Sequence, residues 1–136
     1  MSKSVLTSGI CIQWPYSQYI AEEKKDIETR TYPLAKEYLN RSLLLIETPG
    51  KSQKFKSRAI ALIEFTECFL YPSEDAFYTD FNSHLVDKTS EWRWDDKKPK
   101  WGWRVKIIKK FPPLILTKRV GIIYTKNIPI PAKYFN

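Results

Sequence analysis

The chain has 136 residues, 43% hydrophobic and 28% charged, a composition that predicts one folded domain spanning residues 1–136. Its 23 lysines and arginines exceed its 15 acidic residues, and the net charge of +8 favours an anionic partner, nucleic acid before an anionic membrane surface. No apolar run approaches the ~18 residues of a membrane span and no signal-peptide core follows the first residues, so we expect a cytoplasmic protein that does not enter membranes.

The first predicted elements are a strand and a short helix. Residues 5–13 form a short apolar run that predicts a buried strand. Trp14 and Pro15 end this strand in a turn, and proline suits the first turn of a helix because its missing N–H is not needed there. Apolar residues at helical spacing over residues 16–20 then predict a helix of about two turns.

The segment after this helix changes to a period of two. Alternation places Lys25, Thr29 and Thr31 on one side of an extended segment, and Glu28 and Arg30 on the other. A cation, an anion and a second cation therefore lie within six positions, shortly after a turn that carries a tryptophan. We interpret this segment as a compact polar site beside an aromatic wall.

The middle of the chain predicts two further buried strands, at residues 42–47 and 59–69, after one helical turn at residues 34–39. The loop between these strands is basic, which is typical of a solvated loop or, less often, of a phosphate-contact patch. Glu64 interrupts the second strand, and we interpret it as a buried partner of Arg30 or Lys25.

The second half begins with a predicted helix at residues 72–85, whose buried stripe would be Phe77, Phe81 and Leu85. Residues 103–108 alternate as a strand that the following Phe-Pro-Pro sequence should break. Residues 122–124 predict a closing strand, and two prolines should keep the tail after it irregular.

Residue types that carry metal or redox chemistry are few. Cys11 and Cys68 lie in apolar runs, which predicts free buried thiols. The single histidine, His84, has no usual metal-ligand spacing from either cysteine. We therefore expect no metal site and no cofactor, and the sequence leaves the oligomeric state open.

The order of elements predicts an α+β fold, a small barrel of about five to six strands with short capping helices. A Q-W-P-Y turn, a helix, a K-x-x-E-x-R-T segment, a W-G-W strand and a G-I-I-Y strand follow one another between residues 10 and 124. This order resembles the ASCH domain, a branch of the PUA-like superfamily. The signature of that family is G-x-K-x-x-E-x-R, in which Lys25, Glu28 and Arg30 match and Glu23 replaces the glycine.

The resemblance implies a cleft between barrel and helices that binds RNA or a modified nucleobase or nucleotide. It also implies an alternative, because one member hydrolyses acetylated cytidine with a lysine, a threonine three residues later and a downstream glutamate. Lys25 matches that lysine, whereas Glu28 occupies the threonine position. A hydrolase here would have to use other residues with Lys25, namely Thr29 or Thr31 and an acid such as Glu64, Glu67 or Glu74.

The residues themselves support base recognition. Lys25 and Arg30 offer hydrogen-bond donors, Glu28 can accept from an exocyclic amine, and Trp14 or Trp103 offers a stacking surface. The predicted ligand-binding residues are Trp14, Pro15, Lys25, Glu28, Arg30 and Trp103. The predicted phosphate contacts are Lys51, Lys54, Lys56, Arg58, Lys97, Lys98, Lys100 and Arg104.

Other interpretations remain open from the sequence. The charged trio can be a surface ion-pair row on an edge strand, and the Trp14 turn can be a packing corner. Trp92 and Trp94 lie beside charges, so a third possibility is a protein-interaction module that uses exposed tryptophans.

Overall fold

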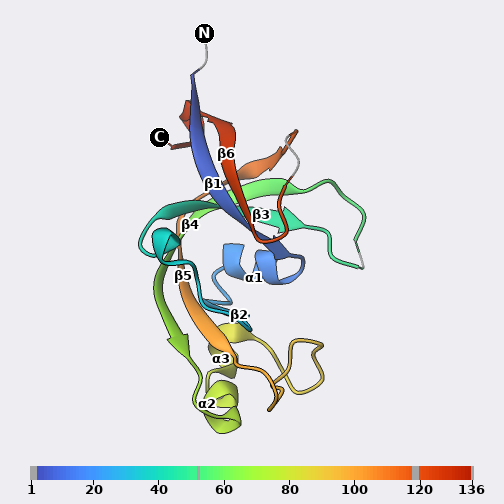
Figure 1. Cartoon of the computed structure of the whole chain (residues 1–136). Coiled ribbons are helices and arrows are strands. Elements are labelled where there is room, and N and C mark those ends of the chain that lie inside the picture. The colour runs from blue at the N-terminus through green and yellow to red at the C-terminus, as the bar shows by residue number, and fades with distance from the viewer. Residues whose placement is uncertain (1–2, 52, 118–119, 136) are drawn as a thin grey trace.

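The computed structural model describes residues 3–51, 53–117 and 120–135. Within these residues, six strands form one mixed sheet accompanied by short helices (Figure 1). The strands are β1 (Ser4–Gln13), β2 (Ile27–Arg30), β3 (Ser42–Thr48), β4 (Arg58–Leu70), β5 (Trp101–Ile115) and β6 (Tyr124–Pro131). The helices are α1 (Tyr16–Ala21), α2 (Glu74–Thr79) and α3 (Phe81–His84), with 3-10 turns η1 (Lys36–Tyr38) and η2 (Ala132–Phe135). The predicted α+β class is confirmed.

The sheet has the order β2-β5-β4-β3-β1-β6, in which β1 and β3 are parallel and the other pairs are antiparallel. The long strands β4 and β5 curve through the molecule, and α2 and α3 lie beyond one end of them (Figure 1). Three register shifts between β4 and β5 accommodate this curvature, because each bulge bends and twists its strand. The curvature brings β2 back toward β1, and Arg30 Nη2 donates to the carbonyl oxygen of Cys11 at 3.0 Å.

The two faces of the sheet bury separate hydrophobic clusters. Ile10 and Ile12 of β1 pack with Phe65 and Trp103 in the larger cluster. Cys11, between them in sequence, belongs to the smaller cluster on the other face. The first strand is therefore buried on both faces, in agreement with the buried strand predicted there. In the described part of the chain, no helix combines the length and the apolar character needed to cross a membrane.

The prediction that Pro112 and Pro113 end their strand is wrong. Strand β5 continues to Ile115, because the prolines lie in a bulge where the ladder to β4 is interrupted. Ala59 pairs with Leu114 while Ala61 pairs with Lys110, so three residues of β5 oppose one of β4. Proline has no N–H to donate, and a bulge does not require one.

The tail is also more regular than predicted. Residues 124–131 form β6, which pairs with β1 only and is an edge strand of the sheet. Pro129 and Pro131 lie opposite Leu6 and Ser4 in this pair. An edge strand tolerates proline because one side of its backbone has no ladder to complete.

The predicted helix over residues 72–85 forms as two short helices, α2 and α3, that meet at Asp80. Ser73 caps α2 by accepting from the backbone N–H of Ala76 at 3.1 Å. Phe77 is buried, but Phe81 is 38% exposed, so the predicted single apolar stripe is wrong. Leu85 ends α3 with a φ of 60°.

A buried carboxylate fixes α1 to the sheet. Glu47, at the end of β3, is fully buried and accepts from Ser17 Oγ and Gln18 Nε2 of α1, each at 2.7 Å. Its second carboxylate oxygen lies 2.7 Å from the Arg58 guanidinium. The polar groups of this cluster satisfy one another, which is the condition for burying a charge.

The helix ends in a Schellman motif that contains the departure from the ASCH signature. Glu23 has a φ of 60°, the left-handed conformation for which glycine is preferred. Its N–H donates to the carbonyl of Ile20 at 3.0 Å, and the N–H of Lys24 donates to the carbonyl of Tyr19 at 2.9 Å. The backbone therefore adopts the turn that the missing glycine would provide.

We predict that Glu23→Gly stabilises the protein by up to about 1 kcal/mol, because glycine removes the steric cost of the left-handed conformation. The matched control is Lys24→Gly, one position later, where φ is not positive and glycine only adds freedom to the unfolded chain. Urea unfolding of both variants would measure the difference. A Glu23→Gly variant that loses as much stability as Lys24→Gly would contradict the prediction.

Candidate functional site

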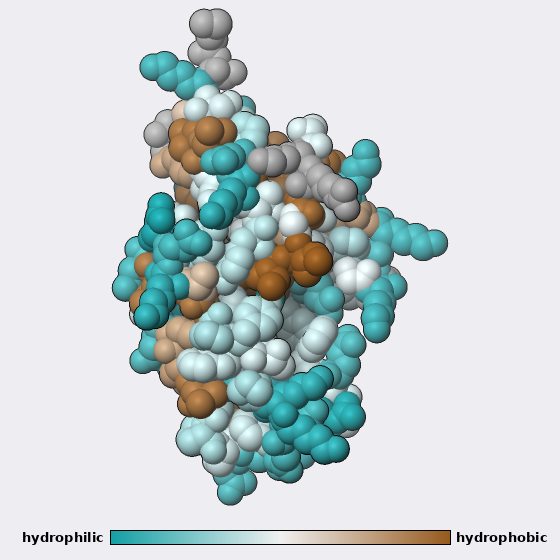
Figure 2. Space-filling view, viewed as in Figure 1, coloured by the Kyte–Doolittle hydropathy of each residue, from teal (hydrophilic) through white to brown (hydrophobic). Residues whose placement is uncertain are grey.

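A pocket of about 330 Å³ opens between β1, β2 and the segment that follows α3. Figure 2 shows a hollow in this face of the molecule, with both hydrophobic and hydrophilic side chains at its border. Its wall consists of Cys11, Ile12, Gln13, Tyr16, Lys25, Glu28, Thr29, Arg30, Thr31, Tyr32, Thr48, Val86, Trp92, Lys100 and Ile122. All three charged residues of the predicted trio are among them.

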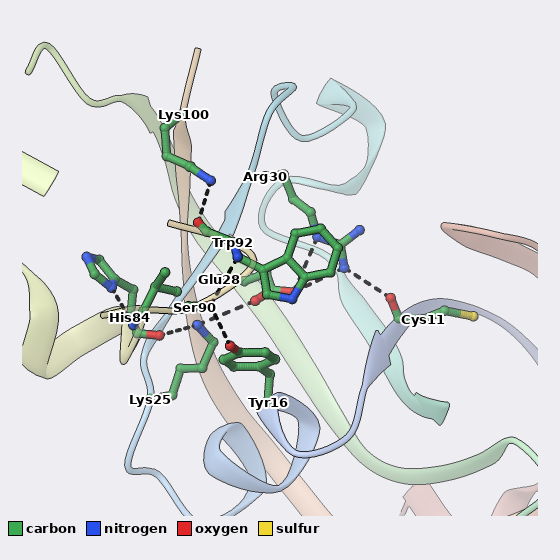
Figure 3. Close-up of polar contacts among 10 residues, drawn as sticks. Cys11, Tyr16, Lys25, Glu28, Arg30, His84, Ser90, Trp92 and Lys100 are labelled. Atoms are coloured by element: carbon green, nitrogen blue, oxygen red, sulfur yellow. Dashed lines mark hydrogen bonds and ion pairs between the residues drawn. The ribbon is translucent and has the colours of Figure 1, made fainter. Parts of the chain in front are cut away.

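Lys25 is the most deeply buried of these three residues. Its Nζ donates to the carbonyl oxygen of His84 at 2.5 Å and lies 3.5 Å from Glu28 Oε1 (Figure 3). Alternation predicted Lys25 and Glu28 on opposite faces, and this is wrong because β2 begins only at Ile27 and Lys25 belongs to the turn before it. Burial lowers the pKa of Lys25, and the neighbouring Glu28 charge opposes that shift.

Arg30 completes the trio from the other side of Glu28. Its Nε and Nη2 donate to Glu28 Oε2 at 3.3 and 3.0 Å, and its Nη1 donates to the Tyr32 hydroxyl at 2.8 Å. Burial is the largest single effect and lowers the pKa of Arg30, but the charge and hydrogen bonds of Glu28 and Tyr32 together outweigh it, so the pKa is raised. Both carboxylate oxygens of Glu28 therefore face a cation.

The exposed fractions of the three side chains decide which of them can touch a ligand. The Lys25 side chain has no exposed surface, whereas those of Glu28 and Arg30 are 8% and 17% exposed. Glu28 and Arg30 therefore present polar atoms to the pocket, and Lys25 orients Glu28 from behind. A carboxylate has about four lone-pair sites, so Glu28 keeps acceptor capacity beyond its two partners.

Three aromatic side chains, those of Tyr16, Tyr32 and Trp92, and a second buried lysine line the same pocket. Lys100 is only 6% exposed, and its Nζ donates to the carbonyl oxygen of Trp92 at 2.8 Å. The hydroxyls of Tyr16 and Ser90 lie 3.2 Å apart (Figure 3). These contacts fix the segment that carries Trp92 over the site. The sequence signalled Trp92 as exposed, but nothing in the local pattern brought it next to residues 25–30.

His84 fixes the backbone that receives Lys25. Its Nδ1 accepts from the N–H of Val86 at 2.9 Å, so its Nε2 carries the proton and donates to the carbonyl of Phe77 at 2.6 Å. Burial lowers the pKa of His84, and the Lys25 charge lowers it further against the effect of the Phe77 carbonyl. The ring is thus held neutral, in one tautomer.

The predicted ligand contacts Trp14, Pro15 and Trp103 do not lie together in one pocket. Trp14 and Pro15 line a second pocket of about 470 Å³, which shares Gln13 and Tyr16 with the first. Trp103 is fully buried in the core, where its ring packs against Phe65 with centroids 5.5 Å apart. The guanidinium of Arg30 lies 5.4 Å from the Trp103 ring, so this indole supports the site from beneath.

The residues of the hydrolase alternative likewise do not all line one pocket. Thr29 and Thr31 line the first pocket with Lys25. Glu64 does not line it, and the ion pair predicted for Glu64 with Arg30 or Lys25 is wrong because its carboxylate lies 3.5 Å from Lys106 Nζ.

The predicted phosphate contacts are of two kinds. Lys51, Lys54, Lys56, Lys97 and Lys98 are exposed. Arg58 is engaged with Glu47, Lys100 with the Trp92 carbonyl, and Arg104 with Asp26 and Glu67 at 3.8 and 3.2 Å. Both cysteines are free thiols. Across residues 3–51, 53–117 and 120–135, no three histidine, cysteine, aspartate or glutamate side chains gather closely enough to hold a metal ion.

Comparison with known proteins places the fold. The chain matches the crystal structure of a serine-to-alanine mutant of ZmASCH from Zymomonas mobilis with a TM-score of 0.63, over 88% of this chain and 86% of that one. The chain has the ASCH fold. The sequence identity is 11%, and no protein-family model and no curated protein sequence matches the chain. The predicted resemblance to the ASCH domain and the predicted small α+β architecture are thus confirmed for the fold.

The ASCH fold here should lose stability in mild acid because of His84. Its pKa is lowered by folding, so below the ordinary value near 6.5 the unfolded chain takes up the proton first and stability falls as pH falls. Protonation would place an N–H of His84 against the N–H of Val86. We predict a smaller change in unfolding free energy between about pH 7 and pH 5 for His84→Gln than for wild type, and equal changes would refute the role of His84.

Proposed function

We propose that the chain, as one domain over residues 1–136, binds RNA or a modified nucleotide by taking one nucleobase into the first pocket. The observation that carries this proposal is the pairing of Glu28 and Arg30 at the wall of that pocket, where their side chains are 8% and 17% exposed and Tyr16 and Trp92 line the same wall. The volume of about 330 Å³ lies in the range of small-molecule sites, roughly 300–1,000 Å³.

The hydrogen-bonding groups of the wall match one kind of base edge. Glu28 accepts and Arg30 donates, which complements an exocyclic amine next to a ring nitrogen. Cytosine and adenine offer this donor–acceptor pair on their Watson–Crick edges. Arg30 has five N–H donors, and four of them are directed at Glu28, Tyr32 and Cys11, which leaves one on Nη1 for a ligand.

The aromatic groups supply the remaining affinity. Trp92 is 44% exposed and lines the pocket together with Tyr16. Stacking of a base on an aromatic ring contributes about 1–3 kcal/mol. Phosphates would remain outside, near the exposed lysines 54, 56, 97 and 98, where a charge keeps its hydration.

We predict that Glu28→Gln weakens binding of cytidine and adenosine monophosphates roughly ten-fold or more, because a charge-assisted hydrogen bond to the base amine is lost. Glu22→Gln, an exposed acid at the end of α1 that does not line the pocket, is the matched control and should bind as wild type does. Isothermal titration calorimetry would measure both variants. Equal affinities for Glu28→Gln and wild type would remove base recognition by this residue.

The phosphate contacts give a separate expectation. Binding of single-stranded RNA should weaken linearly with salt on a log–log plot, and Lys97→Ala and Lys98→Ala should each reduce the slope by about 1. Lys133→Ala, an exposed lysine in η2 near the C-terminus, serves as the control. A slope that neither lysine changes would exclude them as phosphate contacts while leaving the base pocket in place.

A further inference from the structure

The second pocket adjoins the first. It has a volume of about 470 Å³, and Gln13 and Tyr16 line both pockets. Ser90 lines the second pocket, and its contact with the Tyr16 hydroxyl lies at the boundary between the two. Two ligand groups bound in these pockets would therefore be neighbours and would share Tyr16.

The wall of the second pocket offers aromatic surface. Trp14 is only half-buried and belongs to none of the hydrophobic clusters formed by the described residues. Tyr19 lines the same pocket, and its ring meets that of Tyr16 edge to face with centroids 6.1 Å apart. An indole outside the core at a pocket wall is a stacking platform for a planar ring.

The charges of the second pocket select which part of a nucleotide can enter. Asp87 and Glu91 contribute two carboxylates to the wall, against the single ammonium of Lys51. Lys51 Nζ lies 3.7 Å from Glu91 and is highly exposed at the rim. A phosphate inside this pocket would meet two like charges, whereas the amine of a base would find acceptors.

The shared boundary provides neutral donors for the group between two bases. The Gln13 amide, and whichever of the Tyr16 and Ser90 hydroxyls does not donate to the other, can donate to a phosphate oxygen without placing a charge in either pocket. From one pocket to the other, the protein thus offers a site for a base, a bridge of neutral polar groups and a site for a second base. A free nucleoside would fill only the first part.

We propose that the second pocket is a subsite for the base adjacent to the one bound in the first pocket, so that the ligand is an oligonucleotide of at least two nucleotides. This inference rests on the proposed function of the first pocket. Trp14 stacks on the second base, and the carboxylates of Asp87 and Glu91 face its amine.

The test compares cytidine monophosphate with the two dinucleotides of cytidine and adenosine, in both orders, on the wild-type chain. One dinucleotide should bind about five- to 150-fold more tightly than the mononucleotide, the range expected from stacking one further base. Equal affinities for the mononucleotide and both dinucleotides would overturn the subsite while the proposed function stands. Binding of none of the three would overturn both.

Variants on the two walls separate the pockets. Trp14→Ala should abolish the advantage of the dinucleotide and leave mononucleotide binding unchanged, and Trp14→Phe should retain most of the advantage. Trp92→Ala, on the wall of the first pocket only, should weaken mononucleotide and dinucleotide by the same factor. Thermal unfolding verifies that each variant is folded. A dinucleotide advantage that persists in folded Trp14→Ala would overturn the assignment.

Discussion

The burial of the Lys25 charge is the condition on which the arrangement of the site depends. An ammonium without access to water is destabilising by several kcal/mol unless it is paired and hydrogen-bonded. The chain meets this condition with Glu28 of β2 and with the carbonyl of His84 at the end of α3. Arg30 extends the pairing to the backbone of Cys11 in β1. Three segments distant in sequence must therefore take fixed positions around one charge, and the pocket is the space they leave between them.

The same pairing determines how the pocket can distinguish ligands. The Glu28 carboxylate lies between two cations, so its negative charge is offset locally. Under the proposed function, a neutral base would approach without a large electrostatic penalty, and the pattern of donors and acceptors, rather than net charge, would select it. Phosphates have the opposite requirement and are better accommodated at the exposed lysines. The separation of a paired interior from a basic exterior is consistent with the proposal that a chain with a net charge of +8 binds a neutral base in this pocket.

Much of the fold could be predicted because a short, continuous run of apolar residues has few alternatives to forming a buried strand. The trio at residues 25, 28 and 30 could also be recognised, since its residues lie close in sequence. The errors share one cause, which is that local patterns do not reveal tertiary partners. Pro112 and Pro113 predict a break unless the bulge in β5 is known. The sequence alone does not distinguish Trp14 from Trp103, yet Trp14 lines a pocket and Trp103 lies in the core. The segment that carries Trp92 is held at the pocket by contacts that include one between Ser90 and Tyr16, which lie 74 residues apart in sequence.

The position of Glu23 shows why the fold can be matched when the sequence is not. The glycine of the signature reflects a requirement of the backbone: the residue at this position after α1 must have a φ in the left-handed region. Here two backbone hydrogen bonds of the Schellman motif determine the turn, and glutamate takes the conformation at a steric cost. Because Lys25 follows this turn by two residues, its approach to His84 depends on the backbone geometry and not on the identity of residue 23. Two chains can therefore share a fold at 11% identity, provided each replacement still satisfies the backbone dihedral angles that the fold requires.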